Sequence, residues 1–238
     1  MKTPVHGGGG DISTIHDLRR HGSYQTRYCN PALQRFVANP DRFLEQECGR
    51  ILKQDNSSTV GVCALAEWRV VVKRYNIRSI THGFKQALRR SRAEISWHNA
   101  MLLRQHNIAT PEPIIALEVR RGVLRRQAFF VSEYVEGALG TEFFAIADNA
   151  TEAHIDRVVA VFKELYRHRI SHGDMKATNF IMASGGPVLI DLDAMRQHRS
   201  THVHRYRFHR DKRRFLRNWS DNVVLQEQFA QRLESIDG

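Results

Sequence analysis

The segment at positions 172–193, HGDMKATNFIMASGGPVLIDLD, carries side chains whose types and spacing are suited to chemistry. Asp174 is followed by Lys176 and Asn179, and Asp191 ends a short apolar run. A carboxylate can accept the proton of an attacking hydroxyl, and a lysine can neutralise charge on a transferring phosphoryl group. An asparagine and a second carboxylate supply the hard oxygen ligands that Mg²⁺ prefers beside nucleotide phosphates. This order and spacing predict phosphoryl transfer from a nucleotide to an alcohol.

Each of the four groups has a distinct expected role in that transfer. Asp174 is predicted to be the general base, and Lys176 is predicted to face the γ-phosphoryl group. Asn179 and Asp191 are predicted to hold Mg²⁺. An isolated aspartate after a glycine is usually a turn residue, but the groups downstream of Asp174 reverse that expectation. Asp193 has two interpretations of about equal weight, as a metal or substrate ligand and as the cap of the next turn.

A second set of residues, nearer the N-terminus, is predicted to bind the nucleotide. Lys73 follows a valine run on a predicted strand, where an inward-pointing lysine can hold the α- and β-phosphates. Glu94 is the only acid in a helix predicted over 81–105, and we expect it to pair with Lys73. Taken alone, such a lysine often only ends a strand, and such a glutamate often pairs with nearby arginines. The downstream segment requires a phosphate clamp and therefore favours the pair.

Two backbone segments are predicted to complete the nucleotide site. The polar turn after residue 53 carries one glycine where protein kinases have the three of a GxGxxG loop. Its backbone N–H groups and the hydroxyls of Ser57, Ser58 and Thr59 are expected to cradle phosphates. Glu133 and Val135 end the last strand of the strand-rich half. We expect them to form a hinge whose backbone groups bind adenine.

The elements around these residues predict an α+β fold with two lobes. Residues 1–50 are expected to be an N-terminal extension, partly flexible, with one or two short helices over 31–50. Residues 51–136 form the predicted N-lobe, an antiparallel sheet with one helix, and residues 137–238 form a mainly helical C-lobe with a basic aromatic tail. The predicted strands cover 51–53, 60–65, 68–75, 114–119 and 128–135, followed by a helix over 151–168 and short strands around 179–181 and 189–191.

The composition indicates a basic protein with an anionic partner. There are 36 Lys and Arg against 25 Asp and Glu, a formal net charge of +11. Such a charge suits a nucleotide, a nucleic acid or a phosphate-bearing membrane surface, although an ordinary basic protein would carry it too. No aromatic–basic motif with a known docking geometry is present, so nucleic acid is not expected. Neither a secretory signal nor a run of about 18 apolar residues is found, which predicts a cytoplasmic protein able to rest on a membrane surface.

The cysteines and histidines carry no signature of a structural metal site. Three cysteines are widely spaced without a CxxC motif, which fits a reducing compartment and argues against a disulfide framework. Four histidines gather after residue 197 with no cysteine nearby, and we interpret them as solvated basic residues rather than a zinc site. The residues concerned are Cys29, Cys48 and Cys63, and His198, His202, His204 and His209.

The C-terminal stretch at 205–219 mixes cations with aromatic residues. One interpretation is a surface for anionic lipid or for sugar, to which each basic residue near a membrane would add roughly 1 kcal/mol of attraction. The other is a helix whose Phe215, Leu216 and Trp219 pack on the lower lobe. Packing is the favoured prediction.

The motifs HGDxKxxNF and DLD, after a VVKRY strand and an RxRAE helix, resemble those of the bacterial lipopolysaccharide core kinases, the Kdo/WaaP family. The resemblance runs from residue 51 to about residue 217. Aminoglycoside and choline phosphotransferases share the HGD but generally lack the lysine, and eukaryotic-type protein kinases usually have HRD and DFG instead. Carried over by position, the matching active-site residues are Lys73, Glu94, Asp174, Lys176, Asn179 and Asp191.

The resemblance implies a bilobal protein-kinase-like fold that uses ATP and Mg²⁺. The implied reaction phosphorylates a hydroxyl of heptose or Kdo in the inner core of lipopolysaccharide. The implied acceptor is an anionic glycolipid at the cytoplasmic face of the inner membrane, which would account for the basic charge. Two alternatives stay open, an atypical bacterial protein kinase and a non-catalytic nucleotide-binding scaffold. The short segment after Asp193 counts against the first, and the intact catalytic set counts against the second.

Overall fold

The chain folds into two compact units that combine helices with antiparallel sheet. The structure, a computed structural model, describes residues 11–76, 90–121, 124–146, 148 and 151–236. Unit 1 comprises residues 1–98 and 112–134, and unit 2 comprises residues 99–111 and 135–238. The chain enters unit 2 first after His98, returns to unit 1 at Glu112, and enters unit 2 again after Tyr134, whereas the sequence placed one boundary after residue 136.

Unit 1 is built on a seven-stranded antiparallel sheet with the strand order β1-β2-β6-β7-β5-β4-β3. Its central strands are rich in β-branched and aromatic residues, which pack well on a pleated surface, and these strands were expected from the sequence. The strands are β1 (Ile12–His16), β2 (Arg20–Gln25), β3 (Cys48–Gln54), β4 (Ser58–Leu65), β5 (Trp68–Asn76), β6 (Pro113–Arg121) and β7 (Leu124–Glu133).

The first fifty residues differ from the expected extension because much of this segment belongs to the sheet. The hairpin of β1 and β2 pairs with β6, so that Gly22 lies opposite Leu117. The chain then forms η1 (Thr26–Tyr28), α1 (Pro31–Ala38) and α2 (Pro40–Gln46), which agree with the two short helices expected there. Asn30 and Asn39 cap these helices through their side-chain oxygens, and a proline follows each cap at the first helical position.

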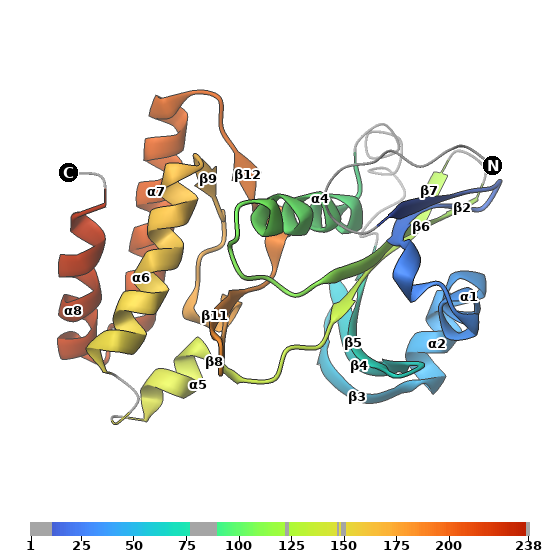
Figure 1. The fold of residues 1–238 in the computed structure, drawn as a ribbon, viewed down its shortest axis with the longest axis horizontal. Helices are drawn as coiled ribbons and strands as arrows, with labels where there is room; N and C mark the ends of the chain where they lie inside the picture. The colour runs from blue at the N-terminus through green and yellow to red at the C-terminus, as the bar shows by residue number, and fades with distance from the viewer. Residues whose placement is uncertain (1–10, 77–89, 122–123, 147, 149–150, 237–238) are drawn as a thin grey trace. The chain divides into compact units, whose positions relative to one another are not determined.

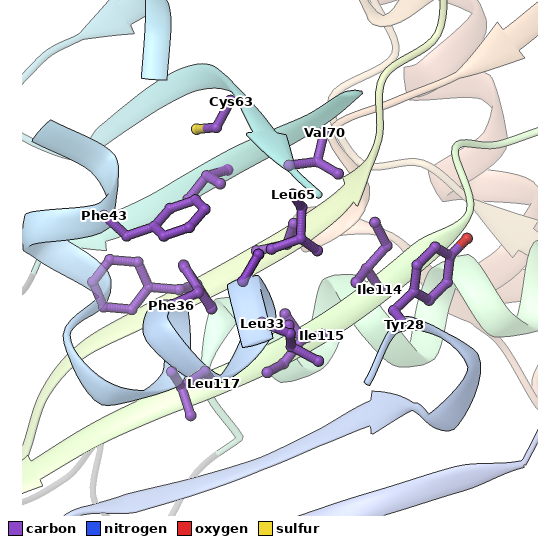
Figure 2. Close-up of a cluster of buried hydrophobic side chains, with 14 of the residues drawn as sticks. Tyr28, Leu33, Phe36, Phe43, Cys63, Leu65, Val70, Ile114, Ile115 and Leu117 are labelled. Carbon is purple, nitrogen blue, oxygen red and sulfur yellow. The ribbon is translucent and has the colours of Figure 1, made fainter. Parts of the chain in front are cut away.

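The core of unit 1 lies where α1 and α2 cover one face of the sheet (Figure 1). Figure 2 labels side chains that meet there from the helices and from β4, β5 and β6, and Phe129 and Val131 of β7 belong to the same core. Phe36 packs edge-on against Phe43 and Phe129, with ring centroids 5.4 and 5.9 Å apart. Burial of each such side chain stabilises the fold by about 1.5–3 kcal/mol, so this face carries much of the unit's stability.

The pairing of β3 with β4 corrects the expectation about the cysteines. Cys48 lies opposite Cys63 in this register, with Cα atoms 3.9 Å apart, and a disulfide joins the two side chains. The expectation that no disulfide forms is therefore wrong for this pair. Spacing alone did not reveal it, because the pairing depends on which strand residues face each other. Cys29 is free and exposed.

Unit 2 is mainly helical and carries two small sheets. The first has the order β11-β10-β8 and the second pairs β12 with β9. The strands are β8 (Ala138–Leu139), β9 (Ile170–Ser171), β10 (Phe180–Ala183), β11 (Gly186–Leu189) and β12 (Arg196–Gln197). Helix α4 (Arg92–Gln105) is divided between the units, and its residues after His98 belong to unit 2. The other helices of unit 2 are α5 (Gly140–Ala145), α6 (Glu152–Arg167), α7 (Thr201–Leu216) and α8 (Val223–Glu234). The 3-10 helices are η3 (Ala177–Asn179), η4 (Leu192–Ala194) and η5 (Arg217–Trp219).

An aromatic cluster holds α6, α7 and α8 together, and Figure 1 shows these helices side by side. Phe162 of α6 packs on Phe215 of α7, with ring centroids 5.1 Å apart, and Trp219 stacks on Phe229 at 5.7 Å. Phe215 and Trp219 are buried. The favoured prediction for the C-terminal stretch, packing on this unit, is confirmed for these two residues.

Two further expectations concern the helix predicted over 81–105 and the membrane. The described helix, α4, begins at Arg92, and the earlier part of the prediction, with Phe84 and Leu88, lies outside the described residues. Among the described residues, no helix is both long enough and apolar enough to cross a membrane.

Candidate active site

The backbone that precedes Asp174 is held from two sides by groups distant in the sequence. His172 is fully buried, and its backbone N–H donates to the Asp211 carboxylate over 2.7 Å. The N–H of Gly173 donates to the same carboxylate, 3.1 Å from each oxygen. The His172 ring donates from Nε2 to the carbonyl of Ile190 over 3.0 Å, a tautomer assigned from its partner. The segment is therefore fixed to both α7 and the strand that leads to Asp191.

Asp211 is a positioning residue that the sequence reasoning missed. Burial raises the pKa of its carboxyl, and the N–H bonds from Gly173 and His172 oppose that rise. Asp211 is the single acid of the strongly basic helix α7, and its spacing places it on the same buried face as Phe208 and Phe215. This pattern could have identified it from the sequence. A buried carboxylate needs a hydrogen-bond donor, and here the backbone N–H groups of His172 and Gly173 donate to it.

Gly173 makes possible the sharp turn that presents Asp174. Its φ is +82°, in the left-handed region that favours glycine. A Cβ at this position would lie 2.6 Å from the carbonyl oxygen of Ala194, which is part of the backbone and cannot move aside cheaply. The HGD motif thus needs its glycine for both conformation and space.

The carboxylate of Asp174 is held by two cations. Lys176 Nζ lies 3.2 Å from Oδ2, so the expected neighbours are brought together. Arg214 of α7 pairs with Oδ1 from the other side, a contact that the sequence reasoning missed. The Asp174 side chain is 29% exposed and its Oδ1 is buried, so Oδ2 is the oxygen that an incoming hydroxyl can reach. Held in one orientation, the carboxylate is suited to accept a proton.

Asn179 and Asp191 come together at the open end of the β10–β11 hairpin. The N–H of Ile190 donates to the carbonyl of Asn179 over 2.9 Å, so Asp191 follows directly beside it. The Asn179 amide donates from Nδ2 to the backbone carbonyl of Asp174 over 2.8 Å, which leaves Oδ1 as its outward acceptor. Asp191 has left-handed backbone angles, φ 63° and ψ 56°. An amide oxygen and a carboxylate fit Mg²⁺ shared with nucleotide phosphates.

The turn after Asp191 is itself anchored. Asn99 of α4 donates from its Nδ2 to the carbonyls of Leu192 and Met195, over 2.8 and 3.0 Å. Asp193 lies within η4, between these two anchored carbonyls. Asn99 is a second positioning residue without a motif of its own in the sequence.

Lys73 lies on the face of the unit 1 sheet opposite its α1–α2 core. Val70 and Val72 point into that core, so Lys73 and Tyr75 point the other way because side chains alternate along a strand. The Lys73 ammonium lies 5.0 Å from the Tyr75 ring centroid, and the Tyr75 hydroxyl lies 3.0 Å from Ser96 Oγ on α4. The lysine therefore emerges on the face that α4 covers, as a phosphate clamp in unit 1 would require.

Glu94 makes different contacts from those expected. Its carboxylate lies 3.4 Å from Arg90 Nε and 3.5 Å from His98 Nε2. A pair with Lys73 is not among the ion pairs of the described residues. The alternative interpretation, a surface glutamate paired with nearby arginines, matches this geometry.

The β3–β4 turn holds itself closed with one carboxylate. Asp55 Oδ1 accepts from the N–H groups of Ser57 and Ser58 over 2.7 and 2.8 Å, and from the Ser57 hydroxyl over 2.6 Å. These are the donors that were expected to cradle phosphates. Thr59 pairs with Arg74 in the strand register, and its Oγ1 accepts from that guanidinium over 3.2 Å. Thr59 thus faces the α2 side of the sheet, away from the Lys73 face.

The expected hinge has part of its backbone engaged within unit 1. The N–H of Glu133 donates to Glu112 over 2.9 Å, and that of Tyr134 donates to Arg69 over 2.8 Å. The Glu133 carboxylate accepts from the Tyr28 hydroxyl, and burial together with this contact raises the pKa of Tyr28. Val135 is the first residue of the second segment of unit 2.

The interpretation of the C-terminal histidines as solvated residues is wrong for His204, which is 2% exposed, and holds for the exposed His202 and His209. His198 Nε2 lies 2.7 Å from Ser171 Oγ, and His204 is buried against the rings of Tyr166 and Phe208. In the described part of the chain, no group of three or more His, Cys, Asp or Glu side chains could hold a metal ion.

Comparison with known proteins places the chain in a family. The sequence model of the lipopolysaccharide kinase (Kdo/WaaP) family matches residues 44–233. The chain belongs to this family. A search of curated proteins found no match. Among solved structures, the chain is similar to WaaP in complex with acyl carrier protein, with a TM-score of 0.52 and 16% identity over 88% of this chain and 98% of that one.

The structural likeness establishes the fold, and the family establishes the class of enzyme. The α+β architecture is that of a protein-kinase-like fold, as expected from the sequence. Membership of the lipopolysaccharide kinase (Kdo/WaaP) family supports phosphotransferase activity for the chain and implies the use of ATP. The residues around Asp174 are consistent with that chemistry.

Proposed function

We propose that this Kdo/WaaP kinase transfers the γ-phosphoryl group of ATP to a sugar hydroxyl, of heptose or Kdo, in the inner core of lipopolysaccharide. The proposal depends most on the site around Asp174. Its carboxylate lies 3.2 Å from Lys176, and the Asn179 amide donates to the Asp174 backbone. A general base, a cation and a metal ligand are thus linked within six residues of one loop.

In the proposed mechanism, Asp174 accepts the proton of the acceptor hydroxyl as that oxygen attacks the γ-phosphorus. The bond between the γ-phosphorus and the β–γ bridging oxygen breaks, and ADP is the leaving group. Lys176 pairs with Asp174 over 3.2 Å, and we assign it to the charge that grows on the transferring group. Asn179 and Asp191 would hold Mg²⁺, which neutralises the β- and γ-phosphates when bound. Lys73 is assigned to the α- and β-phosphates.

The acceptor fits the overall charge of the chain. With a formal net charge of +11, the protein attracts an anionic glycolipid and the anionic surface of the inner membrane. We therefore propose that the enzyme works at the cytoplasmic face of that membrane as a peripheral protein.

The test uses purified protein, γ-labelled ATP, Mg²⁺ and two kinds of acceptor. One is deacylated core oligosaccharide from a strain lacking this gene, and the other is a mixture of peptides. We expect label on the oligosaccharide, located on heptose or Kdo by mass spectrometry, and labelling about 10³-fold slower with Asp174→Asn. Label on peptides alone would contradict the sugar acceptor. Thermal stabilisation by ATP and Mg²⁺ without transfer to either acceptor would instead indicate a non-catalytic module.

A further inference from the structure

A basic cavity opens beside the catalytic loop within unit 2. Its volume is about 430 Å³, and its lining includes Gly173 and five arginines of α7 and η5. We call it the arginine pocket, defined by Gly173, Arg207, Arg210, Arg213, Arg214 and Arg217. The cavity is large enough to hold a phosphate or a carboxylate together with part of a sugar ring.

The helical spacing of these arginines explains why they gather on one side. Arg207, Arg210, Arg214 and Arg217 follow one another at steps of three or four residues, which places them on one face of a helix. The buried residues of this helix lie on a neighbouring face that packs on α6 and α8, and the arginines other than the partly buried Arg214 are exposed. The stripe is therefore presented outward, next to the turn that carries Asp174.

The charge of the pocket is only partly compensated by the protein, through the ion pair of Arg214 with Asp174 and the attraction between Arg210 and Asp211. In the described part of the chain, no carboxylate forms an ion pair with Arg207, Arg210, Arg213 or Arg217. The acid in the lining, Asp211, accepts hydrogen bonds from the backbone of the HGD segment. Like charges this close repel one another, and an anion between them would relieve that repulsion.

Arg214 connects this pocket to the proposed chemistry. One of its terminal nitrogens pairs with Asp174, and its Nε is buried without a hydrogen-bond partner. An unpartnered donor of this kind is costly unless a ligand uses it. A group bound among these arginines would therefore lie beside the base, on the acceptor's side of the reaction. Asn179 and Asp191, the residues assigned to the nucleotide, do not line the pocket.

We propose that the arginine pocket binds an oxyanion on the acceptor saccharide, a phosphate or a carboxylate, and thereby brings a neighbouring hydroxyl to Asp174. The inference rests on the proposed function, since it names the feature by which that site selects its acceptor. Guanidinium groups suit it because they bind both oxyanions in bidentate geometry. The pocket thus sets specificity, while Asp174 performs the proton transfer.

The test combines a double variant, Arg213→Gln/Arg217→Gln, with three matched acceptors. One core saccharide carries phosphate and no free carboxylate, one carries a free carboxylate and no phosphate, and one carries neither. Arg205→Gln is the control, since Arg205 is exposed on α7 and does not line the pocket. Affinity is measured by calorimetry without ATP, and kcat and KM are measured with ATP.

We expect the double variant to bind the preferred charged saccharide at least about tenfold more weakly, with a higher KM and an unchanged kcat. Binding of the neutral saccharide and the melting temperature should not change, and Arg205→Gln should match the wild type throughout. The charged saccharide for which the double variant loses affinity identifies the oxyanion as phosphate or carboxylate.

Two outcomes would overturn the proposal. The first is a double variant that keeps the full preference for charged saccharides. The second is a change in KM for ATP in place of the saccharide, which would assign the arginines to the nucleotide. The wild type could also bind charged saccharide through these arginines and transfer no phosphate. That result would support the pocket and contradict the proposed function, so failure of the pocket proposal and failure of the proposed function are distinguishable.

Discussion

The catalytic loop and the β3–β4 turn are held in opposite ways. The loop before Asp174 depends on Asp211, 38 residues later, and on the carbonyl of Ile190. The turn closes on itself, because Asp55 binds the N–H groups two and three residues ahead. The first arrangement exists only when unit 2 is folded, whereas the second needs a few neighbouring residues.

This difference indicates different demands on the two regions. A base must be placed to within a fraction of an ångström, so it is supported by buried groups from several elements. A turn that covers phosphates can adjust, and an exposed local hydrogen-bond pattern is enough for it. We therefore expect changes at the loop to affect the chemical step and changes at the turn to affect nucleotide affinity.

The largest expected effect is that of Asp174→Asn. The amide keeps the shape of the side chain but cannot accept the proton, so kcat should fall by about 10³-fold. The melting temperature and the affinity for ATP with Mg²⁺ should stay near the wild-type values. Asp156→Asn is the matched control, since that carboxylate is on the surface of α6 and 63% exposed. Equal losses in both variants would show that the assay reports folding.

The next effect is expected at the proposed metal ligand. Asp191→Asn removes the charged oxygen from the pair with Asn179, so kcat should fall by about 10²-fold and the Mg²⁺ concentration for half-maximal rate should rise. The rate is measured across a Mg²⁺ titration. An unchanged Mg²⁺ dependence would contradict the assignment of Asp191.

Removal of the loop's buried support should cost stability as well as rate. Asp211→Ala leaves the N–H groups of His172 and Gly173 buried without an acceptor, and we expect a loss of about 2–4 kcal/mol of unfolding free energy. Urea denaturation measures this loss. Asp156→Ala, which breaks a surface ion pair with Arg232, should cost less than about 1 kcal/mol. Similar losses in both variants would show that the Asp211 contacts are not special.

The smallest effect is expected at the turn. The hydrogen bond from the Ser57 side chain, with help from Lys53 and the backbone, lowers the pKa of Asp55. A lowered pKa means that the stabilising contribution is present above the unfolded value of about 3.9 and is lost as pH falls through the folded value. The stability difference between wild type and Asp55→Ala should therefore shrink between pH 7 and pH 2. A constant difference would contradict the role of the charge.

The same substitution, Asp55→Ala, should tighten the binding of ATP. The substitution frees the N–H groups of Ser57 and Ser58 and removes a negative charge from the turn. We expect KM for ATP to fall by about threefold with kcat unchanged. A change in kcat alone would show that the turn takes part in the chemical step.

Local patterns in the sequence accounted for much of the fold and for the centre of the site. The β-branched runs that became β4 and β5 predicted their strands, and the HGDxKxxN spacing predicted the neighbours of Asp174. Phe215 and Trp219 pack as their spacing indicated. In each case the information lies within a few residues along the chain, where periodicity and motif spacing can be read directly.

The features that escaped prediction depend on contacts between distant segments. The β1–β2 hairpin joins β6 across about ninety residues and has little apolar alternation of its own. Asp211 and Arg214 contact the HGD segment from α7, whose sequence alone indicates only a basic tail. The Cys48–Cys63 disulfide depends on a strand register that contains irregularities. Each of these is set by tertiary packing, which a single sequence does not display.

The most direct test of this account is a single-turnover measurement of phosphoryl transfer from ATP to core oligosaccharide. It compares Asp174→Asn with Asp55→Ala under saturating ATP, so that nucleotide affinity does not enter the rate. We predict that the first variant loses about 10³-fold in the rate of transfer and that the second transfers at the wild-type rate. A near-normal rate for Asp174→Asn would contradict the central claim that this carboxylate accepts the proton of the acceptor.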